Sequence, residues 1–122
     1  MGAEVKILVV DDDLEMCALL SRFFEKHGYI VHSAGDALQA LDILNRENVN
    51  FVIADLMMPH LDGISLIETL KQDPRHKDLP VVLLTAYPSE EILDKGLRKG
   101  AAFALSKPID FERLLSLVRF AH

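Results

Sequence analysis

Cysteine and long apolar runs are scarce in this sequence. Cys17 is the only cysteine among 122 residues, so no internal disulfide can form. No apolar run approaches the ~20 residues that a membrane-spanning helix needs, and the N-terminus is polar, unlike a signal peptide. Internal repeats and low-complexity tracts are also absent from the sequence. These features exclude a disulfide framework and predict a protein of a reducing compartment, the cytoplasm.

Length and composition indicate one globular domain. A typical domain has ~100–150 residues, and this chain has 122, of which 50% are hydrophobic and 26% charged.

The net charge is −6 and is unevenly distributed, because residues 1–61 contain ten acidic and four basic side chains. Residues 62–122 contain nine of each. The acidic first half argues against a nucleic-acid-binding surface, since nucleic-acid phosphates are bound by basic side chains.

Short, nearly continuous apolar runs alternate with amphipathic stretches five times. Such runs are typical of parallel strands that are buried on both faces. The first amphipathic stretch, about residues 14–27, ends at Gly28, and the last has helical apolar spacing after Asp110, a typical N-cap. The predicted strands are Val5–Val10, Tyr29–Ser33, Phe51–Ala54, Val81–Leu84 and Ala101–Leu105.

This alternation predicts an α/β fold, a single doubly wound (βα)5 domain that spans residues 1–122. Right-handed crossovers between successive strands give a parallel sheet with helices on both faces. Five strands suit the flavodoxin-like strand order 2-1-3-4-5. In such sheets, ligands bind beyond the carboxyl ends of the strands, at the switch point beside the first strand.

Polar side chains stand at the ends of four predicted strands. Asp11 and Asp12 follow the first strand and Asp55 follows the third, and these strands are neighbours in the predicted order. Crowded carboxylates raise one another's pKa values, a cost that a divalent cation removes. Oxygen-only ligands favour Mg²⁺, which keeps several waters and accepts phosphate oxygens. Thr85 and Lys107, at the ends of the fourth and fifth strands, would supply a donor and a counter-charge for a phosphoryl group.

Four motifs in this order resemble those of response-regulator receiver domains, the phospho-accepting half of a two-component signalling pair. The motifs are ILVVDDD at 7–13, DLMMPHLDG at 55–63, LLTA at 83–86 and SKP at 106–108. The resemblance covers essentially the whole chain. It implies that a sensor histidine kinase or histidine phosphotransfer protein donates the phosphoryl group. It also implies that a downstream effector protein or a fused output domain responds.

The resemblance implies a role for each acidic residue at the strand ends. Asp55 would be the phospho-accepting nucleophile. Asp11 and Asp12 would bind Mg²⁺, or Mn²⁺ in its place, with Asp12 as the more direct ligand. Asp55 and the backbone carbonyl of Met57 would complete the protein's share of the metal ligands. The chain would then be a phospho-acceptor rather than an enzyme with a separate substrate, apart from self-phosphotransfer and slow autodephosphorylation.

Residues of the second half complete the implied site. Lys107 resembles the lysine that pairs with the phosphoryl oxygens, and its peptide bond to Pro108 is expected to be cis. Thr85 resembles the hydroxyl that turns inward to bond the same oxygens. Asp13 falls just outside the family's acidic pair, and we expect it to favour the start of a helix by ~0.3–1 kcal/mol.

One position departs from the family's pattern and leaves a second function open. Receiver domains usually carry Tyr or Phe three residues before the lysine, where this chain has Ala104. The adjacent Phe103 would point to the opposite face of its strand. The alternative is therefore a receiver-like protein-interaction module that works without phosphorylation.

Two further α/β classes are disfavoured. An aspartate-nucleophile phosphatase of the haloacid-dehalogenase type needs a later acidic pair, and after Lys107 the chain offers only Asp110 and Glu112 at a predicted helix start. A flavodoxin needs a phosphate-binding loop after its first strand. Three consecutive aspartates at that place would repel the phosphate.

The predicted mechanism is a two-state switch. Phosphorylation adds nearly two negative charges to Asp55, and Thr85 with the following loop moves toward them. The surface of the fourth helix, fifth strand and fifth helix then changes, and a homodimer, if one forms, would use this surface. Gly96 and Gly100 predict that the fourth helix is the least rigid of the set.

The chain stops at His122, so we expect either a stand-alone regulator or a receiver from a longer protein, without an output domain here.

Overall fold

The computed structural model describes residues 4–56, 62–86 and 88–122, which form five strands and five helices in alternation. The strands are β1 (Lys6–Val10), β2 (Ile30–Ala34), β3 (Phe51–Asp55), β4 (Val81–Thr85) and β5 (Phe103–Ser106). The helices are α1 (Leu14–Lys26), α2 (Ala37–Arg46), α3 (Gly63–Lys71), α4 (Glu90–Arg98) and α5 (Phe111–Ala121). The predicted alternation of strands and helices is confirmed.

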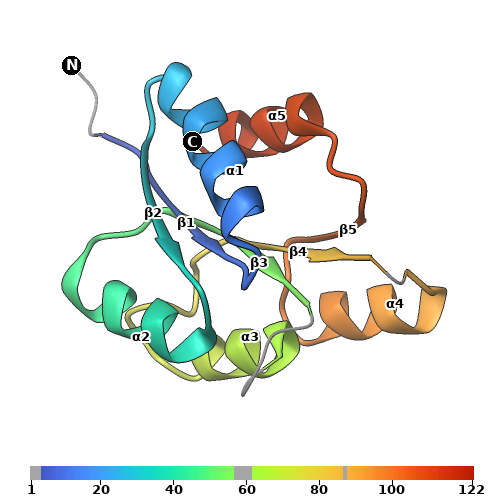
Figure 1. Cartoon of the computed structure of the whole chain (residues 1–122). Helices are drawn as coiled ribbons and strands as arrows, with labels where there is room; N and C mark the ends of the chain where they lie inside the picture. Colours follow the sequence, from blue (N-terminus) through green and yellow to red (C-terminus); the bar gives the residue numbers. More distant parts are fainter. Residues whose placement is uncertain (1–3, 57–61, 87) are drawn as a thin grey trace.

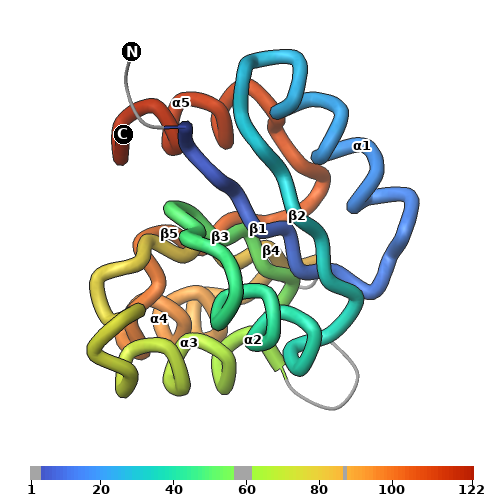
Figure 2. The backbone as a smooth tube through the Cα atoms, turned by 90° about the vertical axis from the view of Figure 1, so that its left-hand side faces the viewer, coloured from blue at the N-terminus to red at the C-terminus, as the bar shows by residue number. Residues whose placement is uncertain are grey.

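The strands form one parallel sheet in the order β2-β1-β3-β4-β5, as predicted. Helices α1 and α5 cover one face, and α2, α3 and α4 cover the other (Figures 1 and 2). Alternate side chains of each central strand enter the two cores. In β1, Ile7 and Val9 pack with α1 and α5, whereas Leu8 and Val10 pack on the opposite face. Burial on both faces explains why the strands are nearly continuous apolar runs.

The observed strand ends differ from the predicted ones by one or two residues. Strands β3 and β4 each extend one residue further, through Asp55 and Thr85, so both polar residues belong to the paired sheet. Strand β5 begins at Phe103, and the predicted start at Ala101 is wrong. The N–H of Ala101 donates to the carbonyl of Gly96 at 3.1 Å, which ties this residue to the end of α4.

Each helix begins after a side chain that accepts hydrogen bonds from amides of the first turn. Asp13 has the predicted helix-start role, because its carboxylate accepts from the N–H groups of Glu15 and Met16. Asp110 caps α5 by accepting from the N–H of Arg113 at 3.1 Å, also as predicted. The caps of the other helices are Asp36, Asp62 and Ser89. Among the described helices, none has the length and apolar character needed to cross a bilayer.

Candidate functional site

Three carboxylates meet at the carboxyl edge of the sheet. Asp11 and Asp12 follow β1, and Asp55 ends the neighbouring strand β3. One carboxylate oxygen from each lies within 4.8 Å of the other two. Asp11 is 2% exposed and Asp55 9% exposed, whereas Asp12 is open to solvent. The predicted convergence of these residues is therefore present in the structure.

The backbone holds the Asp11 carboxylate in place. Its Oδ1 accepts a hydrogen bond from the N–H of Asp13 at 2.9 Å, and its own N–H donates to the carbonyl of Ala34 at 3.0 Å. Burial raises the pKa of Asp11 above that of an ordinary aspartate, although the Asp13 hydrogen bond and the charge of Lys107 oppose the rise. Keeping this buried carboxylate charged is costly, so the site favours a cation.

Lys107 lies between the two buried carboxylates. Its Nζ is 3.5 Å from Asp11 Oδ2 and 3.6 Å from Asp55 Oδ2, and its side chain is 22% exposed. These separations are too long for hydrogen bonds and correspond to ionic contacts. The backbone N–H of Lys107 donates to the carbonyl of Thr85 at 2.7 Å, which ties the end of β5 to the end of β4. The Lys107–Pro108 peptide is cis, as expected.

Strand β4 fixes the backbone around the phospho-acceptor candidate. Within the sheet, Asp55 lies opposite Leu84, and the N–H of the next residue, Leu56, donates to the Leu84 carbonyl at 2.8 Å. Thr85, on the adjacent strand, is 2% exposed at the carboxyl end of β4. The two polar residues thus end neighbouring strands at the same edge of the sheet. Met57, whose carbonyl is a predicted metal ligand, lies outside the described residues.

A family model of the response regulator receiver domain matches residues 7–119. The chain belongs to the response-regulator receiver family. This receiver domain is similar to sporulation initiation phosphotransferase F of Bacillus subtilis, with 32% identity over 114 residues, which cover 93% of this chain and 90% of that protein. It is 40% identical over 114 residues to the transcriptional regulatory protein CpxR homolog of Haemophilus influenzae. That alignment covers 93% of this chain and 48% of the relative.

A solved structure agrees with this assignment. The receiver domain of the Francisella response regulator 1452 superposes with a TM-score of 0.89 at 34% sequence identity, covering 97% of this chain and 96% of that chain. Together with the family match, these similarities make the chain a phosphorelay-type receiver domain of the two-component response regulators. Receiver domains are signalling domains.

The oxygens of this receiver domain fit a hard divalent cation. Three carboxylates stand against one lysine ammonium, which leaves an excess of negative charge at a buried edge of the sheet. Magnesium prefers oxygen ligands and uses few protein carboxylates, keeping other positions for water and phosphate oxygens. The exposed Asp12 leaves one side of this acidic cluster open to solvent.

Gly63 is the last residue of the motif at 55–63, and the sequence assigned no role to it. It is the first residue of α3, directly after the capping Asp62, and its N–H donates to the carbonyl of Leu56 at 2.8 Å. Glycine is a poor helix former, so a glycine that begins a helix indicates a structural need. The need here is close contact, because an added Cβ would lie 2.7 Å from the backbone oxygen of Asp55.

Ala104, the departure from the family's pattern, lies where α4 packs on β5 of this receiver domain. Ala104 packs with the α2–α3–α4 side of the sheet, and Phe103 packs on the α1–α5 side, which confirms that the two point to opposite faces. A Cβ on Gly96 of α4 would lie 2.8 Å from Leu83 Cδ1 and 3.9 Å from the Ala104 Cβ. Small residues on α4 and β5 thus allow a close approach. Gly96 therefore has a packing role, and the lower rigidity predicted for α4 stays a prediction.

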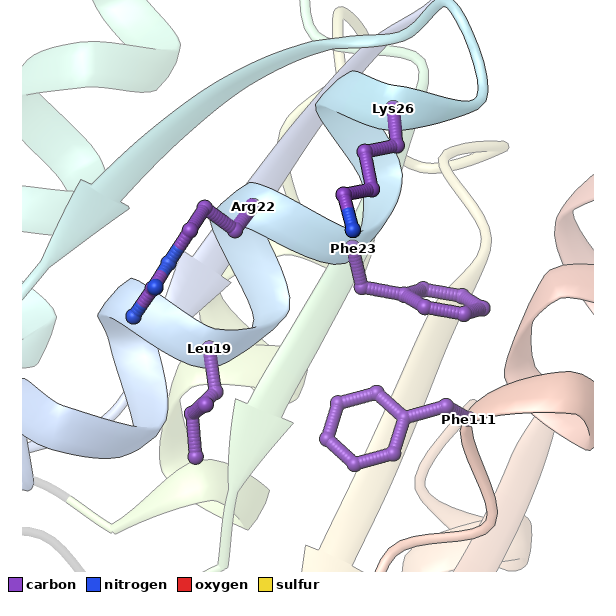
Figure 3. A pocket seen from close by; sticks show the side chains of 5 residues that line it. All are labelled: Leu19, Arg22, Phe23, Lys26 and Phe111. Carbon is purple, nitrogen blue, oxygen red and sulfur yellow. The ribbon is translucent and has the colours of Figure 1, made fainter.

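Away from the acidic cluster, a hollow of about 280 Å³ lies between α1 and α5 (Figure 3). The rings of Phe23 and Phe111 lie side by side there, with their centroids 5.2 Å apart and their planes tilted by 55°. Leu19, Arg22 and Lys26 complete the lining. None of these described lining residues is acidic, so this hollow has no ligands for a hard cation.

Proposed function

We propose that this receiver domain accepts a phosphoryl group on Asp55 in a reaction that requires Mg²⁺ or Mn²⁺. The donor would be a phosphohistidine of a sensor kinase or of a histidine phosphotransfer protein, in the cytoplasm. The observation that carries the proposal is the position of the Lys107 ammonium, 3.5 Å from Asp11 and 3.6 Å from Asp55, beside the three clustered carboxylates. This arrangement supplies a nucleophile, a metal-binding acidic pair and a counter-charge at one edge of the sheet.

In the proposed reaction, a carboxylate oxygen of Asp55 attacks phosphorus and forms an O–P bond. The P–N bond to the donor histidine breaks, and the imidazole nitrogen keeps the bonding electrons and takes a proton. Phosphoryl transfer requires mainly positioning and charge neutralisation from the protein. Lys107 provides a fixed positive charge for the phosphoryl oxygens, and Asp11, Asp12 and Asp55 hold the cation. The bound Mg²⁺ would neutralise further negative charge on the transferred group.

An intact-mass experiment with acetyl phosphate, a small phosphodonor, tests this proposal. We expect one phosphoryl mass on the wild-type chain with Mg²⁺, and none when the cation is removed with a chelator. The reason is that three like-charged carboxylates repel an incoming phosphoryl group unless a cation offsets them. No mass gain in the presence of Mg²⁺ would refute the proposal. An equal gain with chelator would refute the metal requirement.

The proposed output is a change at the α4–β5–α5 surface. A phosphoryl group on Asp55 places a nearly dianionic group beside Thr85 in place of a singly charged carboxylate, and we expect Thr85 and the loop after it to move toward that charge. Thr85 borders a small apolar space together with Ile92 and Leu93 of α4, so its movement reaches that helix directly. The altered surface would regulate an effector protein, an output domain or a homodimer.

Amide hydrogen exchange can detect this change. We expect exchange rates in residues 86–108 to differ between the free chain and the chain with Mg²⁺ and beryllofluoride, a phosphoryl mimic. Exchange in α2 should change little, because α3 lies between that helix and α4 (Figure 1). Unchanged exchange in residues 86–108 would contradict the proposed output.

The second candidate function is a protein-interaction module that works without phosphorylation. Ala104 favours it, because the aromatic side chain that usually accompanies the threonine's movement is missing. The mass experiment separates the two candidates. A chain that binds its partner but gains no phosphoryl group with acetyl phosphate and Mg²⁺ would be such a module.

A further inference from the structure

We infer that Gly63 is a positioning residue for phosphoryl transfer. Because this first residue of α3 has no side chain, the backbone of Asp55 can pack closely against it, and this packing determines the position of the Asp55 carboxylate relative to Lys107. This inference rests on the proposed function of Asp55. Gly63 itself would not touch the phosphoryl group. It acts through the backbone of the acceptor strand.

Leu56, the residue after Asp55, is held from two directions. On one side, the N–H of Leu56 donates to the Leu84 carbonyl of β4 at 2.8 Å. On the other side, the carbonyl of Leu56 accepts from the N–H of Gly63 at 2.8 Å. Strand β4 and helix α3 therefore hold the backbone N–H and the backbone carbonyl of one residue, Leu56. The acceptor side chain projects from Asp55, the residue immediately before Leu56.

Only a residue without a side chain fits at position 63. A Cβ on Gly63 would lie 2.7 Å from the backbone oxygen of Asp55 and 3.1 Å from the Cα of Leu56. It would also lie 2.9 Å from Leu83 Cδ2. The leucine methyl can rotate away, but the Asp55 oxygen is backbone and can move only with its strand or with α3. Alanine at position 63 must therefore displace the acceptor or the start of the helix.

A small displacement is enough to affect the reaction. The ionic contact between Lys107 Nζ and Asp55 Oδ2 spans 3.6 Å, and one oxygen of each acidic residue lies within 4.8 Å of the others, which is close enough to share a cation. A misplacement of about 1 Å in a reacting group costs on the order of 100-fold in rate. The packing at Gly63 thus controls the geometry of the site without contributing a ligand.

Gly96 provides a matched control. A Cβ on Gly96 would lie 2.8 Å from Leu83 Cδ1, so both glycine-to-alanine substitutions push on the same leucine. The other neighbour within reach of the Gly96 Cβ is the Ala104 Cβ at 3.9 Å, an ordinary contact. Only the substitution at Gly63 meets the backbone of the acceptor strand.

The test compares Gly63→Ala and Gly96→Ala with the wild type. The phosphorylation rate is measured from intact mass with acetyl phosphate at saturating Mg²⁺, at a temperature where circular dichroism shows each chain folded. We expect a fall of roughly 10- to 100-fold for Gly63→Ala, with an unchanged acetyl phosphate concentration for half-maximal rate, and a rate close to wild type for Gly96→Ala. A wild-type rate for Gly63→Ala, or equal losses in both variants, would overturn the inference.

A Leu83→Val background separates the two contacts of the new methyl group. If Gly63 acts through the Asp55 backbone, Gly63→Ala stays slow when the leucine methyl is removed. Recovery of the rate would show that only packing against Leu83 matters, and would overturn the inference. If the wild type itself gains no phosphoryl group, the proposed function fails first. If instead the wild type and Gly63→Ala are phosphorylated at the same rate, the proposed function stands and only the inference about Gly63 fails.

A wild-type measurement decides the question if Gly63→Ala does not fold. Because the Gly63 N–H donates to the carbonyl of Leu56, the residue after the acceptor, its exchange should slow when Mg²⁺ and beryllofluoride bind at Asp55. We expect this slowing to exceed that of the Leu66 amide, which donates within the same helix to Asp62. Equal changes at the two amides would overturn the inference.

Discussion

Asp55→Asn is expected to abolish phosphoryl uptake, lowering the rate with acetyl phosphate and Mg²⁺ on the order of 1000-fold or more. The substitution exchanges one carboxylate oxygen for an amide nitrogen and keeps the size of the side chain. It removes the anionic nucleophile and one of the three charges that would hold the cation. The fold should be retained, because Asp55 lies 9% exposed in a paired strand and its neutral substitute reduces like-charge repulsion.

Asp62→Asn is the matched control for this result. Asp62 is also an aspartate near the site, so the same aspartate-to-asparagine change can be made there. Its carboxylate is the N-cap of α3 and accepts a hydrogen bond from the Ser65 N–H at 2.7 Å. Asparagine is an equally good N-cap, so stability and phosphoryl uptake should both be kept. Persistent labelling of Asp55→Asn would place the acceptor on another residue and contradict the proposal.

Lys107→Met is expected to lower the rate of phosphoryl uptake by about 100-fold, the typical loss when one charge-stabilising donor is removed from a reacting centre. Methionine keeps an unbranched side chain but loses the ammonium that lies 3.5 Å from Asp11 and 3.6 Å from Asp55. The metal-free chain should also lose stability, because two buried carboxylates lose their counter-charge. Since the lysine is partly exposed and its charge is screened by solvent, we expect this loss to be only on the order of 1 kcal/mol.

The control for the lysine is Lys99→Met. Lys99 forms a surface ion pair with Glu68 at 3.3 Å, and its side chain is 42% exposed. Surface pairs of this kind contribute little, so both the rate and the stability should stay near those of the wild type. Initial rates from intact mass and midpoints from thermal unfolding check both expectations. A wild-type rate for Lys107→Met would remove the lysine from the proposed mechanism.

The ends of the strands carried most of the information about the site. The apolar runs before Asp55 and Thr85 stop abruptly, and parallel strands place their carboxyl ends at one edge, so the convergence of the acidic residues followed from strand order. The start of β5 could not be predicted in the same way. Ala101 is apolar and fits a strand, but its N–H completes the end of α4 by donating to Gly96, a tertiary detail that residue type does not encode.

The distances within the site could not be predicted from the sequence, for a different reason. Lys107 follows β5, two strands away from Asp55, so its contact with both carboxylates depends on the path of the chain after the strand. Gly63 was missed because glycine near a loop has an ordinary explanation, conformational freedom. Its contact with the Asp55 backbone appears only when α3 is packed against β3.

Chemical trapping of the phosphorylated chain tests the central claim most directly. Borohydride reduces an acyl phosphate to an alcohol, so an aspartyl phosphate becomes homoserine and phosphate is released. The wild-type chain is treated with acetyl phosphate and Mg²⁺, reduced, digested and mapped by tandem mass spectrometry. We expect homoserine at position 55 and at no other position. Homoserine at Asp11 or Asp12, with Asp55 unchanged, would contradict the assignment of acceptor and metal-binding roles.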